Sequence, residues 1–140
     1  MMYLLDTNVL SEFRKSSTGR IDLNVKTWAD RIPESSMFLS SVSILEVETG
    51  VLRMERRDRV QGNLLRAWLD RHVLLGFAGR ILSFDAAMAQ RCARLHVPDR
   101  RSDRDAMIAA TALEHSMTVV TRNVADFAGT GVMLLNPWEG

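Results

Sequence analysis

Short apolar segments alternate along the chain with longer segments in which apolar residues recur every three or four positions. The short segments have the length and composition of buried strands, and they span residues 2–6, 37–41, 80–84, 118–121 and 131–135. The longer segments have the periodicity of amphipathic helices, and they span about residues 22–31, 43–75, 86–95 and 103–115. This alternation predicts an α/β fold with a mainly parallel sheet.

The segment of residues 43–75 is too long for one ordinary helix. Gly62 lies inside it, and glycine destabilises a helix interior by about 1 kcal/mol relative to alanine. We therefore expect a break or a turn at Gly62.

Length and composition favour one small domain. The chain has 140 residues without repeats or low-complexity tracts, so we expect a single domain over residues 1–140.

No apolar segment approaches the roughly 18 residues that span a bilayer, and the first residues have no leader pattern. The single cysteine, Cys92, cannot form an intramolecular disulfide, and its helical segment predicts a small core residue. We expect a cytoplasmic protein without a membrane contact.

The charge balance says little about nucleic acid, because 18 basic residues face 17 acidic ones. Local clusters of arginine are present at residues 53–59 and at residues 100–104. We interpret the first as a solvated helix face, since acidic residues interrupt it, and the second as a polar surface loop that contains Arg104. A phosphate-binding patch is the alternative.

Four acidic residues stand where an apolar segment ends or a helix begins: Asp6, Glu46, Asp105 and Asp126. The carboxyl ends of parallel strands open onto one edge of a sheet, where ligands gather. Neighbouring carboxylates repel one another unless a cation neutralises them. An oxygen-only set of carboxylates suits Mg²⁺ or Mn²⁺.

Each acid also has a purely structural explanation. Ser43 with Glu46, and Ser102 with Asp105, have the spacing of a helix capping box. Asp6 can end a strand before a helix capped by Thr7 or Asn8, and Asn123 with Asp126 can form a turn and a cap. Considered singly, these explanations are favoured. The four acids together favour a metal site.

Four motifs resemble those of PIN-domain ribonucleases, in particular the VapC toxin class of toxin–antitoxin pairs. They are LLDTNVLSE at residues 4–12, SSVSILEVETG at 40–50, DAMIAATA at 105–112, and VTRN at 120–123 followed by Asp126 and Phe127. The segments FAGRIL at 77–82 and NPW at 136–138 resemble the FitB-like branch of that class. The resemblance covers nearly the whole chain.

The resemblance implies a PIN-like domain with a five-stranded parallel sheet in the order 3-2-1-4-5, flanked by helices. It implies a Mg²⁺- or Mn²⁺-dependent endoribonuclease in which Asp6, Glu46 and Asp105 bind the metal. The FitB-like branch can have its fourth acid where this chain has Asn123, so Asp126 is the candidate for the fourth catalytic and metal-binding position. Asn123 is expected to hold a water or to cap a turn. Thr7 is expected to hydrogen-bond a neighbouring carboxylate or a water, or to cap a helix.

The resemblance also implies partners. The class pairs with a small antitoxin that inserts a basic side chain into the acidic pocket, and operator DNA is reached only through the antitoxin. The class commonly forms homodimers, to which we expect an apolar stripe to contribute, made of Val42, Leu45, Val51 and Leu52.

Two alternatives to the ribonuclease remain open. The first is a catalytically silent PIN-like module that acts by binding an antitoxin–DNA complex. The second is a phosphatase of the dehalogenase type, which fits poorly because Asn8 stands where a second aspartate is required.

Overall fold

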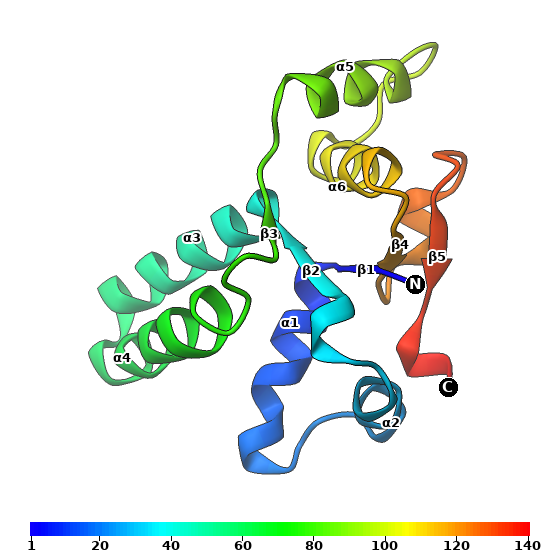
Figure 1. The fold of residues 1–140 in the computed structure, drawn as a ribbon. Helices are drawn as coiled ribbons and strands as arrows, with labels where there is room; N and C mark the ends of the chain where they lie inside the picture. Colours follow the sequence, from blue (N-terminus) through cyan, green and yellow to red (C-terminus); the bar gives the residue numbers. More distant parts are fainter.

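The computed structural model describes all 140 residues and contains one five-stranded parallel sheet (Figure 1). The strands are β1 (Tyr3–Leu5), β2 (Met37–Ser40), β3 (Ile81–Leu82), β4 (Thr118–Val120) and β5 (Met133–Leu135). Their order is β3-β2-β1-β4-β5, and β1 pairs in parallel with both β2 and β4. The predicted α/β class, the five strands and their order are confirmed.

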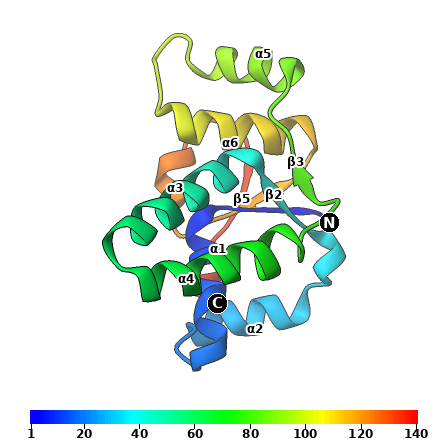
Figure 2. The same ribbon diagram turned by 90° about the vertical axis from the view of Figure 1, so that its left-hand side faces the viewer.

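Helices cover both faces of the sheet. They are α1 (Thr7–Phe13), α2 (Leu23–Arg31), α3 (Ser41–Arg57), α4 (Arg59–Trp68), α5 (Ala86–Leu95) and α6 (Asp103–Glu114). A π-helical segment, Leu69–Leu74, extends α4, and short 3₁₀ segments span Arg14–Thr18, Glu34–Ser36, Val124–Phe127 and Pro137–Glu139. In Figures 1 and 2, α5 and α6 lie on one side of the strands, whereas α1, α2 and α4 lie on the other.

The central strand β1 is buried on both faces. Leu4 and Leu5 point to opposite faces because successive side chains alternate along a strand, and neither is exposed to solvent. Leu4 packs in one hydrophobic cluster with Ile108 of α6, and Leu5 packs in another with Val9 of α1. Burial on both faces explains why the strand segments are continuously apolar rather than alternating.

The long helical segment breaks at Asp58 and not at Gly62. Asp58 ends α3, and its carboxylate caps α4 by accepting a hydrogen bond from the Gln61 backbone N–H at 3.2 Å. Gly62 lies inside α4, where an added Cβ would come within 2.6 Å of the Glu55 Cα. The prediction of a break at Gly62 is therefore wrong: the glycine lets α4 pack closely on α3.

Two residues of the predicted dimer stripe are not available to a partner. Val42 and Val51 are buried in the core, whereas Leu45 and Leu52 are 67% and 53% exposed. The four residues of the stripe lie on two different faces of α3, so the prediction is wrong for the two valines.

Among the helices, none combines the length and apolar character needed to cross a membrane.

Candidate functional site

Asp6 lies where β1 ends and α1 begins, and it is completely buried. Its Oδ1 accepts a hydrogen bond from the Thr7 backbone N–H at 2.7 Å, so Asp6 itself caps α1. Its Oδ2 accepts a hydrogen bond from the Thr121 hydroxyl at 2.8 Å, at the end of the neighbouring strand β4. Both carboxylate oxygens are thus fixed by groups at the carboxyl edge of the sheet.

Glu46 enters the same region from the second turn of α3. The Thr7 hydroxyl lies 2.6 Å from Glu46 Oε1 and 3.0 Å from the Ser43 hydroxyl. The hydroxyl has a single proton, and the shorter contact is the one to which Thr7 donates. Thr7 therefore hydrogen-bonds a neighbouring carboxylate, as one of the two expectations for it stated. The other expectation, that Thr7 caps the helix, is wrong because Asp6 is the cap.

The capping-box explanation of Ser43 and Glu46 is wrong. Helix α3 begins earlier, at Ser41, and Ser40 is its cap, because the Ser40 hydroxyl accepts from the Val42 backbone N–H at 3.0 Å. Glu46 is therefore not needed to begin the helix. At α6, by contrast, Ser102 is the cap and accepts from the Asp105 backbone N–H at 3.4 Å.

Arg104 joins three carboxylates that come from three different elements. Its Nε donates to Glu46 Oε2 at 2.8 Å, its Nη1 donates to Asp105 Oδ1 at 2.9 Å, and its Nη2 donates to Asp6 Oδ1. Nη2 also lies 3.3 Å from the Thr7 hydroxyl oxygen. The interpretation of Arg104 as part of a polar surface loop is wrong, because α6 already begins at Asp103 and directs this side chain into the acidic cluster.

The electrostatic environment keeps Arg104 charged. Burial opposes the charge, but the hydrogen bonds to Glu46 and Asp6 outweigh it and raise the pKa of the guanidinium above its ordinary value. The group is consequently a permanent cation among three carboxylates, bound in the charge-assisted geometry that suits guanidinium.

The fourth corner of the site differs from the other three. Asn123 precedes the 3₁₀ segment Val124–Phe127, and its backbone N–H donates to the Thr121 hydroxyl at 3.0 Å. Asp126 lies in that segment with an exposed side chain, outside the hydrogen bonds that join Asp6, Glu46 and Asp105. The structure thus brings three of the four predicted acids around one cation and leaves Asp126 exposed outside that cluster.

Thr121, which had no predicted role, and Asn8, which was expected only as a possible helix cap, belong to the site. Asn8 Nδ2 lies 3.3 Å from the Thr121 hydroxyl and 3.5 Å from Asp6 Oδ2, and Asn8 Oδ1 accepts from the Arg122 backbone N–H at 3.3 Å. The usable signal was their position, since Thr121 directly follows β4 and Asn8 lies two residues after Asp6 at the end of β1. A strand end in a parallel sheet predicts proximity to the ligand edge.

The donor set fits a hard divalent cation, because it consists of carboxylate and hydroxyl oxygens without histidine or thiolate. The three carboxylates surround the guanidinium of Arg104 as the structure stands. No group of three or more His, Cys, Asp or Glu side chains is arranged to hold a metal ion directly. A metal would therefore have to take the place of Arg104.

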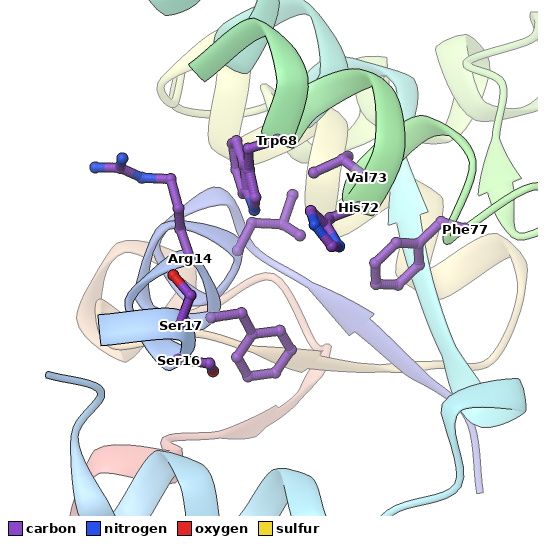
Figure 3. Close-up of a pocket in the computed structure, with 9 residues that line it drawn as sticks. Arg14, Ser16, Ser17, Trp68, His72, Val73 and Phe77 are labelled. Carbon is purple, nitrogen blue, oxygen red and sulfur yellow. The ribbon is translucent and has the colours of Figure 1, made fainter. Parts of the chain in front are cut away.

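Two neighbouring pockets lie away from the acidic cluster. Figure 3 shows a pocket of about 210 Å³ in which Arg14, Ser16 and Ser17 face side chains of α4 and its π-helical extension, such as Trp68 and His72. It adjoins a groove of about 800 Å³ that is rich in basic side chains, among them Arg14, Lys15, Arg20 and Arg71. None of the four acids lines either one. The groove begins where α1 ends, about 10 Å along the helix from Thr7 at 1.5 Å per residue.

The fold is thus an α/β domain with a five-stranded parallel sheet in this order and an acidic site of three carboxylates at the carboxyl edge of the sheet. The model of the family described as "PIN domain" matches residues 3–131. The chain therefore belongs to the PIN domain family.

Two known proteins and one solved structure resemble the chain over almost its whole length. "Toxin FitB" of Neisseria gonorrhoeae is 34% identical over 143 residues, covering 99% of each chain. "VapC ribonuclease Y4jK" of Sinorhizobium fredii is 33% identical, again covering 99% of each. The solved structure titled "Structure of FitAB bound to IR36 DNA fragment" has a TM-score of 0.83 and 33% identity, covering 98% of this chain and 96% of that one. The resemblance expected from the motifs is confirmed.

Proposed function

We propose that the chain is a divalent-metal-dependent endoribonuclease and the toxin of a toxin–antitoxin pair. The observation that carries the proposal is the convergence of Asp6, Glu46 and Asp105 on one cationic position at the carboxyl edge of the sheet. The similarity to a protein named a VapC ribonuclease and to one named toxin FitB supports the substrate class and the biological role.

In the proposed reaction, Asp6, Glu46 and Asp105 hold Mg²⁺ or Mn²⁺. When bound, the ion supplies polarisation of the scissile phosphate and a lowered pKa of water for in-line attack. The chain contributes the orientation of the carboxylates. Thr121 and the Thr7 backbone fix both oxygens of Asp6, and the Thr7 hydroxyl fixes one oxygen of Glu46. Such supporting hydrogen bonds keep ligands in place without reorganisation during the reaction.

We propose that the corner of Asn123 and Asp126 completes the site. Asp126 is exposed, so its carboxylate is free to turn toward a bound ion or a water, and Asn123 stands next to the Thr121 hydroxyl that supports Asp6. The basic groove beyond α1 supports a polyanionic substrate, because Arg14 on its edge follows α1 about two helical turns from Asp6.

The proposed partners follow from the relatives. In the solved structure of FitAB, the complex is bound to the IR36 DNA fragment. We propose that this chain likewise binds a small antitoxin, whose basic side chain enters the acidic cluster, and that it meets operator DNA only through that antitoxin. We also propose a homodimer in which the exposed Leu45 and Leu52 of α3 contribute apolar contact.

The proposal is tested by inducing the chain in cells and mapping new RNA 5′ ends, with Asp6→Asn as the control. We expect discrete new 5′ ends and growth arrest with the native chain, and neither with the variant. A second function, a catalytically silent module that binds an antitoxin–DNA complex, is favoured by the exposure of Asp126 and by the cation already within the cluster. Growth arrest by both chains without new 5′ ends would support that module and contradict the nuclease.

A further inference from the structure

Arg104 occupies the position that the proposed function gives to a metal ion, and the following inference rests on that function. The guanidinium uses all three of its nitrogens on the three carboxylates, at 2.8 Å from Glu46 Oε2 and 2.9 Å from Asp105 Oδ1. Mg²⁺ binds carboxylate oxygens at about 2.1 Å. The same oxygens cannot hold an ion at that distance while the guanidinium lies between them.

The two cations differ in how well they suit the cluster. Three carboxylates face one guanidinium, so a divalent ion balances the charge of the cluster more completely than Arg104 does. The guanidinium, on the other hand, is tethered to α6 and is therefore always present at the cluster. A tethered cation competes at a high effective concentration with a free ion.

The side chain of Arg104 has a route out of the cluster. It is 31% exposed, whereas the side chain of Asp6 beneath it is 1% exposed. Arg104 lies in the first turn of α6, which Ser102 caps independently of the arginine side chain. Rotation of the long side chain toward solvent therefore leaves the helix and the three carboxylates in place.

We propose that Arg104 is an internal counter-ion that fills the metal site in the resting chain and leaves it when a divalent cation binds. The apparent affinity for the metal then equals the intrinsic affinity multiplied by the fraction of molecules in which Arg104 is out of the cluster. The side chain also neutralises the acids in the absence of metal, so that the resting fold does not bear three unpaired carboxylates.

The test compares Mn²⁺ binding, measured by titration calorimetry, in the native chain and in Arg104→Gln. Glutamine keeps a polar side chain and removes the charge. We expect the Mn²⁺ dissociation constant to be roughly tenfold lower, or lower still, in Arg104→Gln. A tenfold change corresponds to a native chain in which Arg104 leaves the site open in about a tenth of the molecules, and a variant in which the site is always open. An equal or weaker affinity in the variant overturns the proposal.

Two control variants separate occupancy from general effects of charge. Arg66 also bridges three acids, Glu48, Glu55 and Asp70, and is 29% exposed, but it lies on α4. Arg66→Gln thus removes a matched ion-pair cluster outside the site. Arg122→Gln removes a positive charge beside the site, where the guanidinium lies 5.3 Å from the Trp138 ring. Neither control is expected to change the Mn²⁺ affinity by more than about twofold, and a tenfold change in either overturns the proposal.

The native chain gives a second readout that does not depend on a variant. In the presence of chelator, the Arg104 Nε–H resonance is expected to be protected from exchange with water, because it donates to Glu46. Saturating Mg²⁺ is expected to remove that protection, and a resonance that stays protected overturns the proposal. If neither the native chain nor any variant binds Mn²⁺, the proposed function fails together with this inference. If all bind with equal affinity, only the inference fails.

Discussion

Replacing Gly62 with alanine tests whether α3 and α4 are held together by close backbone contact. An added Cβ would lie 2.6 Å from the Cα and 2.9 Å from the backbone nitrogen of Glu55. Ordinary contacts between carbon atoms are about 3.5–4.0 Å. Because the obstructing atoms belong to the backbone of α3, relief requires α4 to move away by about 1 Å.

The expected loss of stability follows from two opposing effects. Overpacking of this kind costs about 1–3 kcal/mol, and a rigid backbone obstacle places Gly62→Ala at about 2–3 kcal/mol. Alanine returns about 1 kcal/mol through its higher helix propensity. The free energy of unfolding should therefore fall by about 1–2 kcal/mol. For a chain of this length, that lowers Tm by roughly 3–7 °C.

Gly50→Ala is the matched control. Gly50 lies inside α3, is exposed, and has no atom within 4 Å of an added Cβ. This substitution should raise the free energy of unfolding by about 0.5–1 kcal/mol. Urea denaturation of both variants, with thermal melts followed by circular dichroism, measures the difference. A Gly62→Ala variant as stable as Gly50→Ala would refute the argument that Gly62 serves close packing.

Two further predictions concern single side chains. Thr121→Val removes the hydroxyl that donates to Asp6 at 2.8 Å and accepts from the Asn123 N–H. Urea denaturation should show that the free energy of unfolding falls by about 1–3 kcal/mol. An unchanged free energy of unfolding would contradict the role of these hydrogen bonds. Burial, with a smaller effect of Asp103, raises the pKa of the Cys92 thiol, so iodoacetamide at pH 8 should alkylate it more slowly in the folded than in the urea-unfolded chain. Because the pKa of the thiol is higher in the folded chain, the thiol leaves the free energy of unfolding unchanged at pH 7 and lowers it as the pH rises above about 8.5. Denaturation midpoints at pH 7 and 9.5 would check this. Equal alkylation rates in the folded and unfolded chains would contradict the raised pKa.

The strands were predictable because they are short apolar segments, and the central ones, β1 and β4, are buried on both faces. Continuous apolar segments such as residues 3–5 have no competing periodicity, and every strand begins and ends within two residues of its expected bounds. Their order came from the resemblance and not from the segments themselves. The meeting of Asp6 and Glu46 was predictable from topology, since both follow neighbouring parallel strands.

Features that depend on three-dimensional neighbours were not predictable. Arg104 and Asp6 are 98 positions apart, and although Arg104 directly precedes Asp105, the sequence does not show that its side chain turns toward the acids and not toward solvent, as exposed Arg100 does. Gly62 has the helix-breaking character of any glycine until the proximity of Glu55 is known. The capping box at Ser43 had the right spacing, but the extended backbone of Ser40 provides an earlier cap.

The central claim is that Asp6 lies at the centre of a metal-dependent ribonuclease site. The most direct test incubates the purified chain with total cellular RNA in Mg²⁺, in chelator, and in chelator with Mg²⁺ restored, beside a folded Asp6→Asn variant. The claim predicts cleavage by the native chain that stops in chelator, returns with Mg²⁺, and is absent in Asp6→Asn under every condition. Cleavage that persists in chelator, or that Asp6→Asn performs as well as the native chain, would contradict it.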